Sequence, residues 1–299
     1  MKEKNPNISI NLLAILTAAI WGTTFASTKV LIEHGLAPAQ IMFCRFVLAY
    51  IGICLIARKK RWADCLQDEL WLALAGMMGG SFYFLAENTA LRYTYAANVA
   101  IVIAIVPLVT AYITHIFIRT EPFRRQLLYG GSVALSGILL VVLNGHFILR
   151  ISPMGDLLTL LAVFFWAFYS ILLKKLRHYS SLFITRKVFF YGIITILPAF
   201  LFQPFEFNME TWKTPLVWGN MLYLGIITSL LCYLSWSFVV KKLGIVVCTN
   251  YLYLNPVAAL AVSILILGEP VNPISILGAI LILLGVYLSE QKKKTILNK

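Results

Sequence analysis

The sequence predicts an all-α, polytopic membrane protein with ten transmembrane helices, built as two inverted five-helix repeats around a central cavity. Three observations lead to this fold class: the chain is unusually apolar, its apolar residues form ten long runs, and its second half resembles its first. Hydrophobic residues make up 60% of the 299 residues and charged residues only 12%, whereas a soluble domain is roughly 45–50% apolar. This composition places the chain in a lipid bilayer.

The ten apolar runs have about the 20 residues that a helix needs to cross a hydrocarbon core of roughly 30 Å. Short connections rich in proline, glycine and polar residues separate them. The expected spans are 8–32, 39–57, 70–91, 96–118, 126–144, 156–176, 182–202, 215–240, 245–267 and 273–290.

An internal repeat relates the two halves. The stretch 83–110 is an apolar run that breaks near Arg92 and resumes toward Pro107, and the stretch 232–259 follows the same pattern toward Pro256. Further matches are Glu121-Pro122 with Glu269-Pro270, and the glycine-spaced final helices from Gly130 and from Gly278. The expected units are therefore a first five-helix repeat over 8–144 and a second over 156–290.

The first apolar run belongs to this repeat and not to a cleaved signal peptide. Trp21 and Lys29 are matched at a constant offset by Trp166 and Lys174, which lie in an internal run. A removable leader would not share a pattern with an internal helix.

The distribution of basic residues predicts the orientation, because cytoplasmic loops retain lysine and arginine. With the N-terminus inside, 20 of the 25 basic residues fall in inner segments. Both termini are then cytoplasmic.

Five spans per repeat is an odd number, so the second repeat crosses the membrane in the opposite sense. Inverted repeats support alternating access to a central site, which indicates transport.

Glu87 is the one carboxylate that lies clearly inside an expected span. A charged group at such depth is costly and usually faces a cavity or a partner. Glu87 is therefore the candidate for proton coupling. The alternative is a structural carboxylate that pairs with Arg92 or Arg45 and holds helices together.

A helical stripe contains the same carboxylate. Gly76, Gly80, Tyr83 and Glu87 recur at i, i+4, i+7 and i+11, which places them on one face. The glycines would let a neighbouring helix approach, so that the ring and the acid point toward the cavity.

The remaining cavity candidates are deep aromatic residues and polar residues on similar stripes. Most membrane tryptophans and tyrosines belong to interfacial belts, but Trp21, Trp166 and Trp236 lie near the middle of their spans, where an indole N–H needs a buried partner or an aqueous lumen. The complete candidate set is Trp21, Thr24, Tyr83, Glu87, Asn88, Asn98, Trp166, Tyr169, Trp236, Asn250 and Tyr253.

Two prolines occupy matched positions in the repeats. Pro107 and Pro256 each remove a backbone hydrogen bond within an expected span. A static kink and a moving hinge both fit this pattern.

Other function classes find little support. The net charge of +13 comes from short basic clusters between apolar runs, whereas nucleic-acid binding requires one solvated basic face. The sequence contains no GxSxG, HExxH or Walker motif and no paired acids. We expect neither an enzyme nor a metal or other cofactor.

Several local motifs together resemble the EamA-like branch of the drug/metabolite transporter superfamily. These are Trp21-Gly22, Arg45-Phe46, the ALRYTYAA block at 90–97, the proline-to-Glu-Pro spacing and the glycine-spaced final helices. The resemblance covers roughly residues 10–290. It implies a bacterial-type inner-membrane transporter with both termini inside, whose cavity is lined by spans 1, 3, 4, 6, 8 and 9. Such proteins commonly export amino acids or related metabolites. The second half departs from the first at Trp236, which stands where the first half has Glu87.

The sequence thus predicts a secondary transporter of the inner (plasma) membrane that exports a small metabolite such as an amino acid. Its expected partners are that substrate, the lipid bilayer and protons as the coupling ion, with a homodimer as an option. Two alternatives stay open: a nucleotide-sugar or other anionic metabolite carrier of the same superfamily, and a non-transporting membrane sensor or assembly component.

Overall fold

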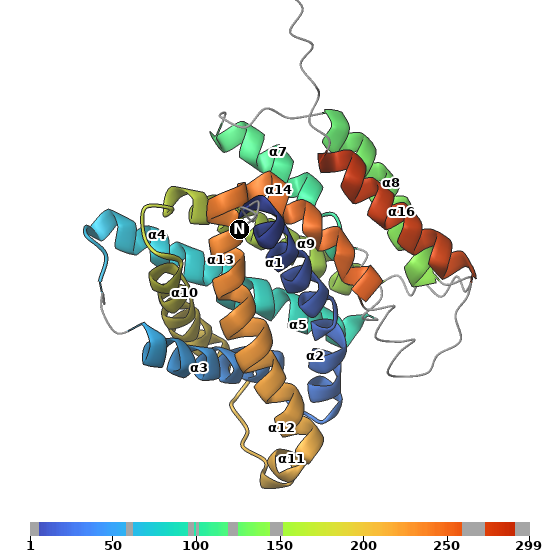
Figure 1. Ribbon diagram of the computed structural model, residues 1–299. Helices are drawn as coiled ribbons and strands as arrows, with labels where there is room; N and C mark the ends of the chain where they lie inside the picture. Colours follow the sequence, from blue (N-terminus) through green and yellow to red (C-terminus); the bar gives the residue numbers. More distant parts are fainter. Residues whose placement is uncertain are drawn as a thin grey trace, which may run out of the picture.

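The computed structural model describes residues 6–57, 62–94, 99, 102–118, 125–143, 152–258 and 273–290, and over these ranges the chain is helical without strands (Figure 1). Asn98 and both Glu-Pro pairs lie outside the described residues. The first half comprises α1 (Pro6–Gly22), α2 (Thr24–Glu33), α3 (Pro38–Ile56), α4 (Leu66–Gly76), η1 (Met77–Phe82), α5 (Tyr83–Tyr93), α7 (Val106–Ile118) and α8 (Arg125–Leu143).

The second half begins with one unbroken helix where the first half has α1 and α2. It comprises α9 (Pro153–Lys175), α10 (Ser181–Ile196), η2 (Leu197–Leu201), α11 (Met209–Lys213), α12 (Pro215–Leu222), η3 (Tyr223–Leu231), α13 (Cys232–Leu243), α14 (Ile245–Asn250), η4 (Tyr251–Leu254) and α16 (Pro273–Glu290).

Local signals in the sequence account for several helix starts. Pro38, Pro153 and Pro215 are first helical residues, where the missing N–H of proline has no intrahelical acceptor to lose. The Ser180 hydroxyl accepts the backbone N–H of Phe183 at 3.2 Å and caps α10, which satisfies a donor that the first turn leaves free.

Six helical segments are long and apolar enough to cross a membrane, and four shorter apolar helices accompany them among the described residues. The number of ten transmembrane helices stays a prediction, because the expected spans 96–118 and 245–267 extend into residues that the structure does not describe. The six long segments are Ile8–Glu33, Pro38–Ile56, Leu66–Tyr93, Pro153–Lys175, Ser181–Leu201 and Pro215–Leu243. The four shorter helices are Val106–Phe117, Gln126–Leu140, Ile245–Ala258 and Ile276–Ser289.

The outer surface of these helices is apolar. Ile51 and Leu55 on α3 are 55% and 67% exposed, and Leu283 on α16 is 52% exposed. Large apolar side chains that point outward from several long helices would aggregate in water, but they suit contact with lipid chains.

The third long segment of each half contains a π-helix. In the first half η1 lies between α4 and α5, and in the second half η3 lies between α12 and α13. A π-turn accommodates one extra residue, and such turns frequently occur at functional sites. Both π-helices directly precede the helix that carries the cavity candidates of that segment.

Contacts between the halves come in matched pairs. The third segment of one half packs on the first helix of the other half, because α5 contacts α9 and α13 contacts α1. The second helix likewise packs on the third segment of the other half, with α3 on η3 and α10 on α4 and η1. The final helices α8 and α16 pack on each other and lie side by side at the edge of the molecule (Figure 1).

Glycine permits the close contact between α8 and α16. A Cβ atom on Gly137 would lie 2.5 Å from the carbonyl oxygen of Gly278 and 2.7 Å from the nitrogen of Ile282. Because only glycine fits where two backbones come this close, the glycine spacing of both final helices specifies their packing.

Candidate functional site

A small cavity lies between the two halves, at the centre of the helix packing. Its wall includes residues of α1, α3, α5, α9 and α13, together with η4 and Asn255. The volume is about 30 Å³, which is roughly the space of one water molecule in the liquid. The helices are therefore closely packed around this cavity.

Glu87 contributes a carboxylate to this cavity. Its side chain is buried, with 5% of the residue exposed, and the Tyr83 hydroxyl donates a hydrogen bond to Oε1 at 3.1 Å. Because Tyr83 and Glu87 are four residues apart on α5, both side chains point from the same face into the cavity.

Arg45 contributes the opposite charge. It is 1% exposed, and its Nε and Nη2 atoms donate to Ser229 Oγ at 2.9 Å and Thr228 Oγ1 at 2.8 Å. The guanidinium also lies 4.2 Å from the ring centroid of Phe84. Hydroxyl groups of the second half therefore hold this arginine of the first half.

The structural alternative for Glu87 was an ion pair with Arg92 or Arg45. Arg45 lines the same cavity, but its hydrogen bonds go to hydroxyl groups. Arg92 is exposed at the end of α5. Lys29, another basic residue expected within a span, donates to the carbonyl of Leu91 at 2.9 Å and does not line the cavity. Arg45 is thus the cation that shares the cavity with Glu87 in the described part of the chain.

Aromatic rings make up much of the cavity wall. Trp21 lies edge-on to Trp166 at a centroid distance of 5.2 Å, and Tyr83 lies 5.0 Å from Trp166. Tyr233 contacts both tryptophans at 5.8 and 5.9 Å. The indole N–H of Trp166 has no hydrogen-bond partner among the described residues. A bound molecule that displaced these rings could accept that hydrogen bond.

Two hydrogen bonds connect the aromatic residues to the π-helices of opposite halves. Trp21 Nε1 donates to the carbonyl of Thr228 in η3 at 3.0 Å, and the Tyr233 hydroxyl donates to the carbonyl of Gly79 in η1 at 2.5 Å. The first bond runs from the first half to the second, and the other runs in the reverse direction. In each case an aromatic side chain of one half is hydrogen-bonded to a backbone carbonyl in the π-helix of the other half.

Five of the sequence-predicted candidates line the cavity, and five are buried outside its lining. Asn88 donates to the carbonyl of Pro38 at 3.3 Å and so joins α5 to α3. Those that line the cavity are Trp21, Thr24, Tyr83, Glu87 and Trp166. Those that pack outside it are Asn88, Tyr169, Trp236, Asn250 and Tyr253. Asn98 lies outside the described residues.

Helix interruptions occur directly before both prolines. Pro107 is the second residue of α7, which starts after a turn at 104–105. Pro256 follows η4, a short 3-10 helix. In both places proline stands in the first turn of a new helical segment, where its missing N–H costs little.

The break in span 1 between α1 and α2 also contributes to the site. Gly22 ends α1, and a Cβ atom there would collide with the backbone of Asn255. Only glycine lets the chain at Asn255 approach α1 so closely. Asn255 consequently reaches the cavity wall beside Thr24.

Sequence reasoning missed Tyr233, Phe84 and Asn255 as lining residues. Thr228 and Cys232 are four residues apart and would share one face of an uninterrupted α-helix. The π-helix η3 intervenes and adds a residue, so that Tyr233 faces the cavity instead. The glycine-rich Met77–Phe82 segment was a sequence signal for the other π-helix, but η3 contains no comparable cluster.

Comparison with known proteins identifies the family. The model of the EamA-like transporter family matches residues 8–143 and again residues 153–290. The chain belongs to the EamA-like transporter family. It is therefore a multi-pass membrane transporter and not an enzyme, and the family model is matched once in each half of the chain.

Relatives match along nearly the whole chain. An "Uncharacterized transporter" of Archaeoglobus fulgidus is 28% identical, covering 96% of this chain and 99% of the relative. A "Probable amino-acid metabolite efflux pump" of Salmonella typhimurium is 27% identical over 93% of each chain. A "Probable terminal-alkyne amino-acid exporter" of Streptantibioticus cattleyicolor is 25% identical, covering 93% of this chain and 92% of the relative.

A solved crystal structure shares the fold. It superimposes with a TM-score of 0.73, covers 94% of this chain and 97% of its own, and is 17% identical in sequence. At this identity the likeness supports the helical architecture alone.

Proposed function

We propose that this EamA-like transporter is a secondary transporter that exports a small amphipathic metabolite, with an amino acid as the favoured class, by alternating access. The observation that carries the proposal is the central cavity, in which Glu87 and Arg45 place opposite charges among aromatic rings. An amino acid has an ammonium group, a carboxylate and a side chain, and each has a complementary group in this wall.

The chemistry of the wall assigns a role to each group. The carboxylate of Glu87 is the site for a substrate cation, while Arg45 is the donor for a substrate carboxylate, because a guanidinium fits carboxylate oxygens. Trp21 and Trp166 supply apolar surface, and a tryptophan face also attracts an ammonium group. Two relatives named for amino-acid or amino-acid metabolite export are consistent with this class of substrate.

The close packing at the centre suits an alternating-access cycle. A cavity of about 30 Å³ is too small for an amino acid, so binding requires the rings to separate. The matched packing of each half on the other supports two inverted five-helix repeats, in which such a separation can open either side in turn. Ten spans, both termini in the cytoplasm and a location in the inner membrane complete the proposal, and they follow from the distribution of basic residues.

Glu87 is proposed to couple transport to protons. It is the carboxylate in the cavity lining, and Tyr83 orients it. A carboxyl group that is sealed from water in one conformation and exposed in another can take up a proton on one side of the membrane and release it on the other.

The test of coupling uses proteoliposomes that contain the purified full chain. A thermal-shift screen against amino acids, polyamines, nucleosides and nucleotide sugars first identifies a ligand, because a compound that binds the folded state raises its apparent stability. Exchange of that ligand is then measured with and without an imposed pH gradient. We expect Glu87→Gln to retain exchange and to lose acceleration by the gradient.

The matched control is Glu33→Gln, since Glu33 is an exposed carboxylate at the end of α2. It should respond to the gradient like the parent protein. A Glu87→Gln variant with a full response would remove Glu87 from the coupling mechanism.

The same screen examines the anionic alternative. A nucleotide-sugar carrier needs several cations in its cavity, but Arg45 is the one basic residue among the described lining residues, and Glu87 offsets its charge. Stabilisation by nucleotide sugars, and not by amino acids, would replace the amino-acid proposal with the anionic one.

A further inference from the structure

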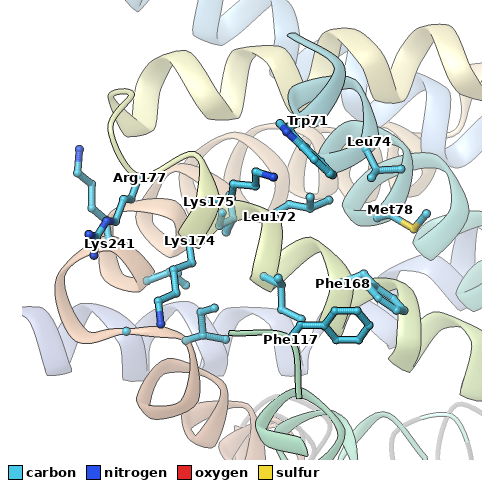
Figure 2. A pocket seen from close by; sticks show the side chains of 15 residues that line it. Trp71, Leu74, Met78, Phe117, Phe168, Leu172, Lys174, Lys175, Arg177 and Lys241 are labelled. Atoms are coloured by element: carbon cyan, nitrogen blue, oxygen red, sulfur yellow. The ribbon is translucent and has the colours of Figure 1, made fainter. Parts of the chain in front are cut away.

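A second, larger cavity has its own set of lining residues (Figure 2). Its volume is about 1050 Å³, and no described residue lines both cavities. Helices α4, α7, α9, α13 and α14 contribute to its wall, together with the start of η1. Nothing in the proposed transport cycle uses this cavity.

The wall has a basic end and an apolar end. Figure 2 shows Lys174, Lys175, Arg177 and Lys241 on one side and Phe117 and Phe168 on the other. The described lining residues include four cations and no carboxylate. An anionic group with an attached apolar portion would complement both ends.

The protein holds two of these cations in place. Lys175 Nζ lies 3.5 Å from the ring centroid of Trp71, and Lys241 Nζ donates to the carbonyl of Tyr179 at 3.0 Å. The Tyr179 hydroxyl donates one hydrogen bond, at 2.9 Å, to the carboxylate of Asp68 in the first turn of α4. The ammonium groups of Lys175 and Lys241 are therefore positioned before any ligand arrives, which reduces the entropy cost of binding.

The order of the two ends along the helices matches the order of layers in a membrane. Lys174 and Lys175 lie in the last turn of α9, and Lys241 lies in the last turn of α13. Phe168 precedes Lys175 by seven residues, which places it about 10 Å deeper at 1.5 Å per residue. The cations thus lie near the level of lipid headgroups and the rings near the level of acyl chains.

Trp71, Leu74 and Met78 extend this apolar wall. They recur at i, i+3 and i+7 along α4 and η1, and all three line the cavity, as expected of one helical face. A soluble phosphate compound would fill the basic end and leave this apolar face uncovered.

We propose that this cavity binds one anionic phospholipid. The lipid phosphate lies among Lys175, Arg177 and the neighbouring lysines, and an acyl chain runs along Phe168 toward Met78. Basic pockets between transmembrane helices are suited to such headgroups. The inference is independent of the transported substrate.

The test uses the full chain purified in detergent and titrated with phosphatidylglycerol, phosphatidylcholine or glycerol phosphate. Apparent affinity is obtained from the rise in unfolding temperature with ligand concentration. We expect phosphatidylglycerol to stabilise the protein, and phosphatidylcholine and glycerol phosphate to have little effect. Equal stabilisation by glycerol phosphate would overturn the proposal and indicate a site for small soluble anions.

Paired variants test the basic end. The double variant Lys175→Gln with Arg177→Gln should bind phosphatidylglycerol roughly 30-fold more weakly, the factor that follows from about 1 kcal/mol per basic residue near an anionic lipid. Its control is Lys213→Gln with Lys242→Gln, which removes the same charge from exposed residues outside the cavity. An equal loss in both double variants would overturn the proposal, because it would show attraction by surface charge alone.

A separate variant tests the apolar end and does not depend on recovery of the basic variants. Phe168→Ser keeps all four cations and removes a half-exposed ring. It should weaken phosphatidylglycerol binding by about three- to sevenfold, because the acyl chain covers only the 39% of Phe168 that is exposed and complete burial of a phenylalanine side chain contributes about 1.5–3 kcal/mol. Unchanged affinity would contradict the placement of the acyl chain.

Discussion

Replacing Tyr83 with phenylalanine would isolate the interaction that orients Glu87. The substitution removes one oxygen atom, which donates to Glu87 Oε1 at 3.1 Å. The ring would keep its contacts with Phe84 at 4.9 Å and with Trp166 at 5.0 Å. Tyr83→Phe therefore changes a hydrogen bond and leaves the packing of the aromatic wall intact.

The expected cost depends on the protonation state of Glu87. A hydrogen bond to a charged acceptor contributes about 1.5–3 kcal/mol, and one to a neutral acceptor about 0.5–1.5 kcal/mol. If Glu87 exchanges a proton, as we propose, the cost of Tyr83→Phe should be larger at mildly alkaline pH, where the carboxylate is ionised, than at mildly acidic pH. The difference should be about 1 kcal/mol.

Reversible unfolding in mixed micelles would measure this difference. The free energy of unfolding of the parent and of Tyr83→Phe is determined across the pH range, and again with Glu87→Gln in both proteins. In the presence of Glu87→Gln the cost of Tyr83→Phe should be small and independent of pH, because the amide does not ionise. This comparison separates Glu87 from all other titrating groups.

Tyr169→Phe provides the matched control. Tyr169 is fully buried in the same aromatic cluster, and its hydroxyl has no hydrogen-bond partner among the described residues. Its removal should be nearly neutral or slightly stabilising at every pH. A cost of Tyr83→Phe that did not change with pH would refute the proton exchange of Glu87 in this conformation.

Three further predictions concern packing and topology. Gly137→Leu should destabilise the protein by about 1–3 kcal/mol or more, because the side chain would force α8 and α16 apart. Gly219→Leu is the control, because nothing lies within 4 Å of the Cβ position of Gly219, and its unfolding temperature should stay close to that of the parent. Equal losses of stability in the two variants would contradict the close-packing argument. Trp236→Ala should cost about 3–5 kcal/mol, since the ring is fully buried, and a variant of unchanged unfolding temperature would show that the ring is not part of the core. Single cysteines at Asn208 and Gln291 should react with an impermeant reagent from outside and from inside respectively, and reaction of both from one face would rule out the proposed orientation.

Much of the helical framework could be predicted from apolar run length and helix-start signals. The expected spans 39–57 and 156–176 lie within three residues of Pro38–Ile56 and Pro153–Lys175 at each end. Run length determines where a helix crosses the membrane, and a proline in the first turn determines where it starts. The depth argument grouped Trp21, Trp166 and Trp236. Trp21 and Trp166 line the central cavity, whereas Trp236 packs against both rings and does not line it.

Which side chains point into the cavity was harder to predict, because their direction depends on helical phase. Each residue of an α-helix turns the chain by about 100°, so one additional residue in a π-turn redirects every side chain that follows. Tyr233, and not Cys232, lines the cavity two residues after η3 ends. Asn88 was among the predicted lining residues, but it follows Glu87 on α5 and points in a different direction, so that it contacts Pro38 instead.

The bonds from aromatic rings to the two π-helices make the geometry of one half depend on that of the other. Tightening η3 to ordinary α-helical geometry would rotate the carbonyl of Thr228 away from Trp21, and the same change in η1 would withdraw the carbonyl of Gly79 from Tyr233. Trp21 and Tyr233 also touch each other, with ring centroids 5.8 Å apart, so neither ring can reorient without displacing the other. A change of helical pitch in one half is consequently transmitted to the other half through two side chains, and the two rearrangements are expected to occur as one concerted step.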